Sequence, residues 1–191
     1  MRICSGSLRG KKIRTKRGIS TRPLLSRVRK SLFDILGEAI REEKFLDLYA
    51  GSGAVGIEAL SRGAKEAVFV EIDPECVRII KDNLFHCDVS SRAKVYQEDV
   101  LHILLFILKK DRFGFIFVGP PYFKNLQNRT LDIIESLKDY QGEVIVQHSP
   151  LENIKFKREN VDFIEQRRYG DTCLTFLFKR KDLRGKINGK E

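Results

Sequence analysis

Cysteine is scarce in this chain of 191 residues, and its few copies are not paired. The four cysteines are scattered, and no two of them form a C-x-x-C pair. Paired cysteines at short spacing are typical of zinc sites, and dense cysteines are typical of small disulfide-linked folds. The three histidines are equally dispersed. We therefore expect reduced thiols in a cytoplasmic protein without a metal site.

Long hydrophobic runs are also missing. The longest one, residues 101–108, is interrupted by His102, whereas a helix that spans a bilayer needs about 20 apolar residues. The first residues do not combine basic residues with an apolar stretch in the manner of a secretory signal. We expect no membrane partner. With 42% hydrophobic and 32% charged residues, the composition is ordinary for one globular domain with a short addition.

Acidic residues are missing from the first part of the chain. Residues 1–33 hold eleven basic side chains and no acidic one, and the rest of the chain holds 25 basic and 26 acidic side chains. The whole net charge of +10 therefore lies in this block, which is typical of a segment that binds a polyanion. A solvated basic tail is the alternative, but Gly6, Gly10 and Gly18 at turn-like spacings favour a folded segment. The candidate nucleic-acid contacts are Arg2, Arg9, Lys11, Lys12, Arg22 and Arg27.

The hydrophobic pattern alternates between short apolar runs and longer amphipathic stretches. The runs predict strands at 45–49, 67–72, 94–97, 113–118 and 143–148. The stretches predict helices at 26–41, 54–62, 74–85, 100–109 and 128–138. Gly170-Asp171 is a hairpin turn signal between two final strands at 161–168 and 172–179. Residues 1–15 predict a short hairpin with Gly10 near its turn.

Strands that alternate with helices predict a doubly wound α/β fold, with a mostly parallel seven-stranded sheet that ends in an antiparallel hairpin. We divide the chain into a basic N-terminal β-hairpin extension at 1–25, a main domain at 26–180 and a basic tail at 181–191. In such a sheet, cofactors bind at the carboxyl ends of the strands, near the point where the strand order reverses. The residues that follow the first four strands are therefore the candidates for a site.

A glycine-rich motif follows the first strand. Gly51, Gly53 and Gly56 match G-x-G-x-x-G, and Glu71 follows Gly51 by twenty residues, which is the spacing of a dinucleotide-binding site. A nicotinamide dehydrogenase is therefore one interpretation. Asp47 argues against it, because a pyrophosphate at a helix N-terminus gains nothing from a neighbouring carboxylate. S-adenosylmethionine carries an ammonium and a sulfonium instead, and an acid followed by three residues and G-x-G is typical of its methyltransferases.

Two further acids follow the next strands. Glu71 ends the second strand, where a carboxylate can accept hydrogen bonds from both hydroxyls of a ribose. Asp99 follows the third strand, where its side chain or the amide of Val100 can meet the edge of an adenine. Each acid alone is typical of a helix cap or of the surface, and Asp73 before Pro74 is expected to cap its helix. The cofactor residues that we expect are Asp47, Gly51, Gly53, Glu71, Asp99 and Val100.

The fourth strand ends in Gly119-Pro120-Pro121-Tyr122, which we expect to be catalytic. Two prolines fix two φ angles and remove two amide donors, so the loop is rigid and its carbonyls are free to accept hydrogen bonds. Such carbonyls can bind the N–H groups of an exocyclic amine, and Tyr122 can stack on a flat base. The lone pair of that amine is delocalised into its ring, and acceptors on its N–H groups localise it for attack on a methyl group. Positioning and electrostatics then supply most of the catalysis.

Over nearly its full length, the chain resembles the bacterial 16S ribosomal RNA guanine-N2 methyltransferases of the RsmD family, which are Rossmann-like class I methyltransferases. The resemblance is carried by residues 2–12, 21–23, 27–33, 47–56, 58–63 and 168–172. It implies transfer of a methyl group from S-adenosylmethionine to the N2 amino group of a guanine in small-subunit rRNA. It further implies that residues 119–122 hold the guanine and that the basic extension holds 16S rRNA or the small ribosomal subunit. We expect a monomer.

Position 119 departs from this family, which has Asp or Asn before Pro-Pro-Tyr. The missing side chain is the one expected to accept a hydrogen bond from the target amine, and its loss corresponds to roughly 10²–10³ in rate. Three explanations remain open: an engineered change, an enzyme that uses another acceptor, and a cofactor-binding assembly factor with impaired catalysis. An adenine-N6 methyltransferase of DNA or RNA also remains an alternative, because its chemistry uses the same loop and cofactor.

Overall fold

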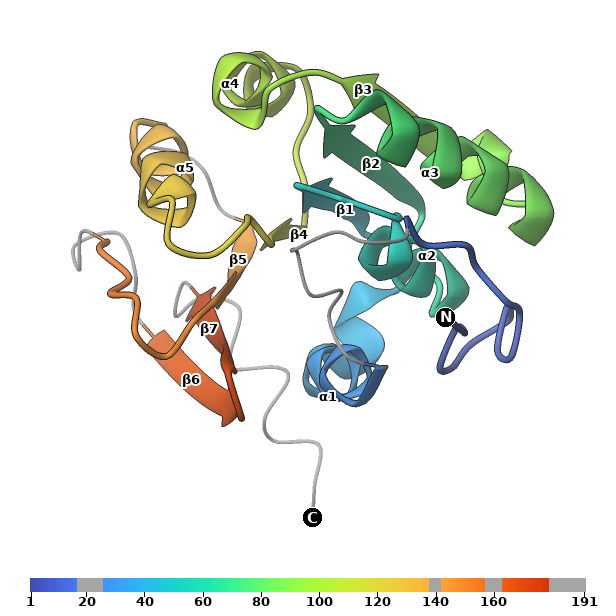
Figure 1. Cartoon of the computed structure of the whole chain (residues 1–191), viewed down its shortest axis with the longest axis horizontal. Helices are drawn as coiled ribbons and strands as arrows, with labels where there is room; N and C mark the ends of the chain where they lie inside the picture. The colour runs from blue at the N-terminus through green and yellow to red at the C-terminus, as the bar shows by residue number, and fades with distance from the viewer. Residues whose placement is uncertain (17–25, 138–141, 157–162, 179–191) are drawn as a thin grey trace.

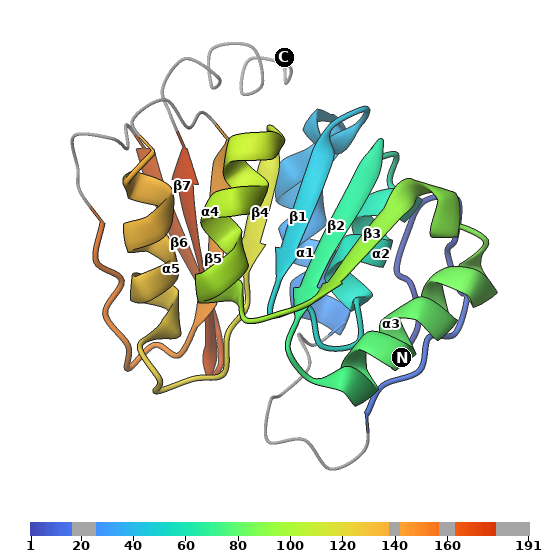
Figure 2. The ribbon, with the colours of Figure 1, turned by 90° about the horizontal axis from the view of Figure 1, so that it is seen from above.

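A seven-stranded sheet with helices on both faces forms the body of the protein (Figures 1 and 2). The computed structural model describes residues 1–16, 26–137, 142–156 and 163–178. The strands are β1 (Lys44–Leu48), β2 (Glu66–Glu71), β3 (Ala93–Gln97), β4 (Phe115–Val118), β5 (Glu143–His148), β6 (Phe163–Tyr169) and β7 (Thr172–Phe178). The helices are α1 (Ser26–Leu36), α2 (Ala54–Ser61), α3 (Pro74–Cys87), α4 (Val100–Lys110) and α5 (Leu126–Glu135), with short 3₁₀ turns η1 (Gly37–Ile40) and η2 (Ser90–Arg92).

The strand order is β3-β2-β1-β4-β5-β7-β6. Strands β1 to β5 pair in parallel, and β7 runs antiparallel to both of its neighbours. The predicted fold class, including the final antiparallel pair, is therefore confirmed. The chain runs outward from β1 to β3 and then returns to place β4 on the other side of β1. The carboxyl ends of β1 and β4, Leu48 and Val118, are paired neighbours at this point of reversal, where such folds bind their ligands.

Side chains alternate between the two faces of each central strand. In β2, Ala67 and Phe69 pack in a cluster with α2 and α3, whereas Val68 and Val70 pack in a cluster with α4 and α5. This alternation follows from the two-residue period of a strand. Because both faces of the central strands are covered, β4 is apolar throughout and β2 is apolar between its two end residues. Among the described helices, none is both long and apolar enough to cross a membrane.

Some boundaries differ from the sequence predictions, because the chain turns at residues with positive φ. The first helix ends as an α-helix at Leu36, since Gly37 has a φ of 52°, and it continues only as the 3₁₀ turn η1. Strand β1 ends at Leu48, since Tyr49 has a φ of 60°. Asp73 caps α3 as predicted, and its side chain accepts hydrogen bonds from the amides of the second and third helical residues.

The predicted N-terminal hairpin is reduced to a single bridge between Arg2 and Lys12. Ile3, Leu8 and Ile13 are buried in the cluster that includes α2 and α3. Their five-residue spacing does not match the two-residue period of a strand, so the segment packs its apolar side chains against the helices instead of forming a longer ladder. The predicted domain boundaries at residues 25 and 180, and the tail at 181–191, lie outside the described residues.

Candidate functional site

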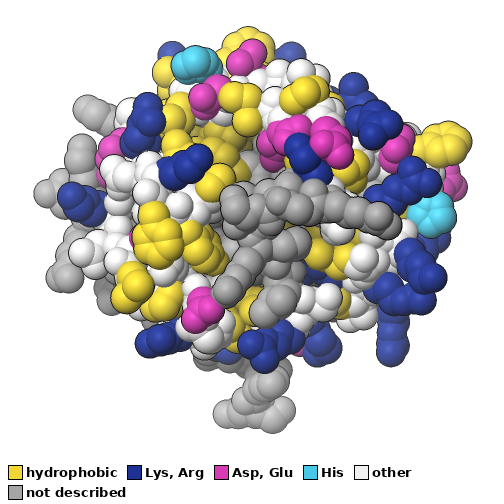
Figure 3. All heavy atoms as spheres, in the orientation of Figure 1, with side chains coloured by type: hydrophobic (Ala, Val, Ile, Leu, Met, Phe, Trp, Pro, Cys, Tyr) yellow, Lys and Arg dark blue, Asp and Glu magenta, His cyan; other side chains and the backbone are white. Residues whose placement is uncertain are grey.

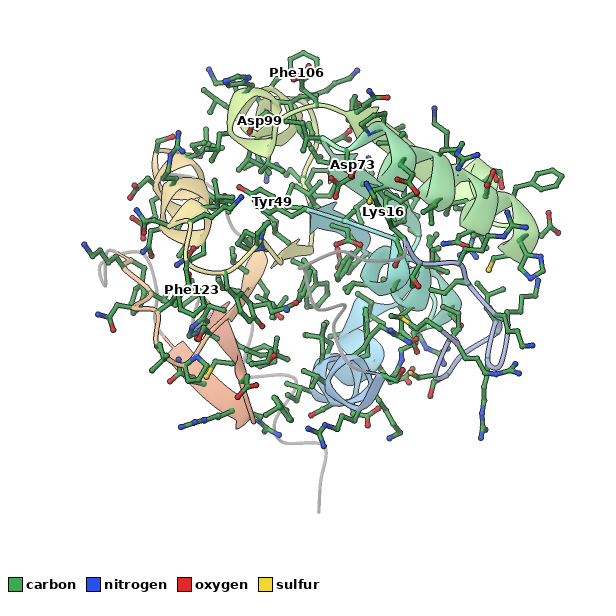
Figure 4. The ribbon with its side chains drawn as sticks, viewed as in Figure 1. Lys16, Tyr49, Asp73, Asp99, Phe106 and Phe123 are labelled. Atoms are coloured by element: carbon green, nitrogen blue, oxygen red, sulfur yellow. The ribbon has the colours of Figure 1, made fainter. Side chains whose placement is uncertain are left out.

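A cavity of about 860 Å³ opens at the carboxyl ends of β1, β4 and β5. The loops that follow these strands line it, together with Lys16 of the N-terminal segment. Asp47, Gly51 and residues 119–122 all contribute to the lining, so the acid and both predicted motifs meet in one pocket. Figure 4 labels three residues that line the cavity: Lys16 and Tyr49 near the centre of the view and Phe123 to the left.

Asp47 contributes a buried carboxyl group to this pocket. Its side chain is 1% exposed, and its Oδ2 accepts a hydrogen bond of 2.8 Å from the amide of Gly56 in the first turn of α2. Asp47 thus satisfies one of the amides that a helix N-terminus leaves without a partner. Burial raises the pKa of Asp47 to about 8, against the lowering effect of the Gly56 hydrogen bond and with a further contribution from the charge of Glu71.

The glycine motif shapes the backbone beside Asp47. Gly51 and Gly53 have φ angles of 57° and 75°, which side-chain-bearing residues rarely adopt. A Cβ atom on Gly56 would lie 2.3 Å from Cε1 of Phe69, so the third glycine allows α2 to pack closely on β2. Glu71 accepts a hydrogen bond of 2.7 Å from the amide of Gly51, and its carboxylate therefore ties the loop after β1 to the end of β2.

Asp99 and Val100 lie at the start of α4, outside the described lining of the cavity. Asp99 caps this helix, and its Oδ1 accepts a hydrogen bond of 2.8 Å from the amide of Leu101. Val100 is buried in the cluster beneath α4. Figure 4 shows Asp99 on the α4 side of the view, away from Phe123. Their part in cofactor binding, like that of the other predicted residues, stays a prediction.

The Gly119-Pro120-Pro121-Tyr122 loop is held from two sides. The amide of Gly119 donates to the carbonyl of Leu48 at 3.3 Å, which keeps the loop beside the end of β1. The hydroxyl of Tyr122 lies 2.9 Å from Oγ1 of Thr172 and accepts a hydrogen bond of 3.1 Å from Nε2 of Gln147. A Cβ atom on Gly119 would lie 2.7 Å from Cε1 of Phe117, so a side chain there requires the phenyl ring to shift.

The mouth of the cavity carries exposed apolar side chains. Phe123 is 68% exposed and Leu151 is 83% exposed, and both line the opening. Oε1 and Oε2 of Glu152 accept hydrogen bonds of 2.8 Å and 2.9 Å from the amides of Phe123 and Ser149, which joins the two loops that carry these side chains. Figure 3 shows hydrophobic atoms grouped on this side of the face. Exposed aromatic groups of this kind can stack on unpaired bases.

Sequence reasoning missed many residues of the pocket, among them Lys16, Phe117 and Gln147. Lys16 is held at the cap of α3, where its Nζ lies 2.5 Å from Asp73 and 3.0 Å from Glu75 (Figure 4). These two carboxylates raise the pKa of Lys16. The available signal for Gln147 was the change from apolar to polar residues at Gln147-His148, where β5 ends.

The predicted RNA contacts are not gathered around the cavity. Nζ of Lys11 donates to the carbonyl of Cys87, at the end of α3 that is remote from the pocket. Arg9 and Lys12, close to Lys11 in the sequence, are exposed, and Arg27 is exposed at the start of α1. Figure 3 shows Lys and Arg side chains along the side formed by α3 and the N-terminal segment. Arg2 donates to the carbonyl of Gly10, and Arg22 lies outside the described residues.

The thiols and histidines are dispersed as the sequence indicated. Within the described residues, no group of three or more His, Cys, Asp or Glu side chains is placed to hold a metal ion. Cys173 is buried in β7. His148 is also buried, and its Nε2 lies 2.8 Å from Oγ1 of Thr175.

The sequence matches a described protein family and individual relatives. Residues 1–178 match the family described as Conserved hypothetical protein 95. A relative from Buchnera aphidicola, ribosomal RNA small subunit methyltransferase D, is 34% identical over 139 residues, which cover 71% of this chain and 70% of the relative.

Two solved structures share the fold. A hypothetical protein of Thermus thermophilus is 32% identical with a TM-score of 0.76, and the match covers 94% of this chain and 99% of that chain. The T. thermophilus 16S rRNA N2 G1207 methyltransferase in complex with AdoMet and guanosine is 21% identical with a TM-score of 0.65, and the match covers 91% of this chain and 46% of that chain. At this identity, the second likeness concerns the fold alone.

Proposed function

The chain belongs to the Conserved hypothetical protein 95 family, which includes the ribosomal RNA small subunit methyltransferases D, and we propose that it methylates the N2 amino group of a guanine in 16S rRNA. S-adenosylmethionine is the methyl donor, and ribosomal RNA is the substrate. The observation that carries the proposal is that the buried acid Asp47 and the Gly119-Pro120-Pro121-Tyr122 loop line the same pocket. Asp47 supplies a site for a cationic cofactor, and the loop supplies hydrogen-bond acceptors for an amine.

The residues present fit S-adenosylmethionine. Asp47 offers a carboxyl group to the ammonium of the cofactor, and the backbone at Gly51 and Gly53 can approach it closely because neither glycine has a side chain. We infer that Glu71 accepts hydrogen bonds from the ribose and that Asp99 or the amide of Val100 meets the adenine. These three residues lie outside the described lining of the cavity. When bound, the cofactor supplies an electrophilic methyl group on a sulfonium sulfur.

The loop at residues 119–122 orients the target base. The carbonyls of Gly119 and Pro120 accept hydrogen bonds from the exocyclic amine and localise its lone pair, and the ring of Tyr122 stacks on the base. Such groups act through positioning and electrostatics, because they are fixed before the reaction begins. The loop is fixed here by the hydrogen bonds of Tyr122 to Gln147 and Thr172.

Methyl transfer to unmodified small ribosomal subunits tests this function. We expect labelled methyl groups from S-adenosylmethionine to appear as N2-methylguanosine after digestion of the RNA to nucleosides. Asp47→Ala and Glu71→Ala should greatly weaken cofactor binding, measured by calorimetry. Wild-type affinity in both variants would contradict the assignment of the pocket.

The product separates the alternatives. N6-methyladenosine would replace the guanine assignment by the adenine-N6 interpretation. If only the Gly119→Asp variant transfers methyl groups, the unaltered protein binds the cofactor and RNA but does not catalyse the transfer efficiently. Gly119→Ala is the matched control, because it introduces the same contact with Phe117 without an acceptor. No transfer by any of these proteins would favour the assembly-factor interpretation.

A further inference from the structure

Gln147 places a carboxamide next to the residue that lacks a side chain. In the parallel pairing of β4 and β5, Val118 lies beside Val146, so the following residues, Gly119 and Gln147, are neighbours at the edge of the pocket. Gln147 is 7% exposed and lines the cavity. A carboxamide buried to this degree needs hydrogen-bond partners for its donor and its acceptor.

The donor side of this carboxamide is satisfied within the protein. Nε2 of Gln147 donates to the hydroxyl of Tyr122 at 3.1 Å, and that hydroxyl lies 2.9 Å from Oγ1 of Thr172. This chain of hydrogen bonds fixes the rotation of the carboxamide about its last bond. Its nitrogen is turned to Tyr122, and its oxygen is therefore turned to Gly119.

The acceptor side is free for a ligand. Oε1 of Gln147 lies 3.5 Å from the position that a Cβ atom of residue 119 would take. Among the residues that the structure describes, none donates a hydrogen bond to this oxygen. An Asp or Asn side chain at position 119 would therefore begin next to this oxygen. Position 119 thus lacks an acceptor side chain, and Gln147 presents an acceptor oxygen beside it.

We propose that Oε1 of Gln147 is the side-chain acceptor for the target amine, in the place that an acid or amide at position 119 would otherwise take. The inference rests on the proposed function, since it needs an exocyclic amine in the pocket. The amine donates one N–H to this oxygen and another to the carbonyls of the Gly119-Pro120 backbone. Gln147 is then a catalytic residue, and its hydrogen bond to Tyr122 couples the acceptor to the ring that stacks on the base.

The chemistry balances without a charged base. The lone pair of the amine nitrogen forms the new N–C bond, and the S–C bond breaks with its electron pair retained on sulfur. The methylated nitrogen carries a positive charge until one of its protons leaves to water. The carboxamide is neutral and accepts the hydrogen bond without taking up that proton.

Three variants test this role. Gln147→Met keeps the size of the side chain and removes the acceptor, and Gln147→Glu retains an acceptor oxygen. Gln166→Met is the matched control on β6, outside the lining of the cavity. In single turnovers on small subunits, we expect Gln147→Met to be about 10²-fold slower than wild type. Gln147→Glu should stay within about tenfold of wild type, and Gln166→Met should match it. Calorimetric affinities for S-adenosylmethionine should be the same in all four proteins.

The outcomes separate this inference from the function itself. A wild-type rate for Gln147→Met, or equal slowing in Gln147→Met and Gln147→Glu, would overturn the role of the oxygen. If the product is N6-methyladenosine, the guanine assignment fails, while the ratio between wild type and Gln147→Met still decides the role of Gln147. If only Gly119→Asp transfers methyl groups, the inference is overturned and the family function stands.

Discussion

The carboxyl group of Asp47 couples the pocket to pH. Burial raises its pKa to about 8, whereas the ammonium of a bound cofactor favours the ionised carboxylate. Binding of the cofactor therefore requires that Asp47 lose its proton. The affinity for S-adenosylmethionine should rise as the pH increases from 6 to 8. Calorimetry in buffers of different ionisation enthalpy measures this proton release. In Asp47→Asn, we expect weaker binding with no dependence on pH in this range.

The same group affects the stability of the free protein in the opposite direction. Because the pKa of Asp47 is raised from its ordinary value of 3.8 to about 8, its contribution to stability is fully present below pH 4 and is lost as the pH rises through 8. Asp47→Asn should therefore raise the melting temperature more at pH 8 than at pH 5. Equal effects at the two pH values would contradict the raised pKa.

Single residues differ in how far the sequence predicts them. Asp47 and the Gly119-Pro120-Pro121-Tyr122 loop were predictable, because each belongs to a local motif that directly follows a strand. Gln147 and Lys16 were not, because their positions depend on contacts between distant parts of the chain. Gln147 is placed by the register of β5 on β4, and Lys16 by ion pairs with the cap of α3. The spacing of residues along the sequence predicts neither of these two positions.

Among the elements, α1, α2 and the N-terminal segment meet at a buried ion pair. Nε of Arg29 lies 3.2 Å from Oε2 of Glu58, and both side chains are fully buried. The same carboxylate accepts hydrogen bonds from the amides of Cys4 and Ser5, and Arg29 donates to the carbonyl of Arg2. One ion pair therefore holds two helices and the start of the chain together.

Glu58→Gln should lower the free energy of unfolding by about 3–5 kcal/mol, because it leaves the Arg29 guanidinium buried without a counter-charge. Urea denaturation measures this change. Asp34→Asn is the matched control, since Asp34 pairs with Arg62 as Glu58 does, but on the surface. Asp34→Asn should lower the free energy of unfolding by about 0–1 kcal/mol. Equal losses in the two variants would contradict the importance of the buried pair.

At the scale of elements, the sequence predicted the order and type of every strand and helix of the main sheet. The alternation of short apolar runs with amphipathic stretches carries this information, because each face of the sheet is covered by helices. The N-terminal hairpin was predicted less well. Its apolar residues Ile3, Leu8 and Ile13 pack on α2 and α3, and tertiary packing of this kind overrides local strand preference.

For the whole molecule, the basic residues near Lys11 and the pocket lie at different places, whereas Lys16 lines the pocket. Residues 11–16 run along α3, from Lys11 at its last turn to Lys16 at its cap. The helix has 14 residues, which correspond to about 21 Å at 1.5 Å per residue. An RNA that places its base in the pocket and its phosphates on Lys12 must therefore span the side of the molecule.

Removal of charge tests whether RNA takes this path. The triple variant Arg9→Gln/Lys11→Gln/Lys12→Gln should bind the rRNA substrate more weakly and lower the salt slope of binding by roughly 0.7 for each phosphate that the variant no longer neutralises. The matched control is Lys109→Gln/Lys110→Gln/Arg112→Gln, which removes the same charges at the end of α4 and beyond, and it should keep the wild-type slope. An unchanged slope in the first variant would show that the block only solubilises the protein.

Glu71 ties the loop after β1 in the free protein, and this has a consequence for the catalytic cycle. Its two carboxylate oxygens accept hydrogen bonds from the amides of Gly51 and Asp73. In its proposed role, the carboxylate exchanges these partners for ribose hydroxyls when the cofactor enters and takes them back when the product leaves. The loop therefore stays ordered between turnovers, little conformational entropy is lost when the next cofactor binds, and replacement of spent cofactor by fresh cofactor needs no refolding step.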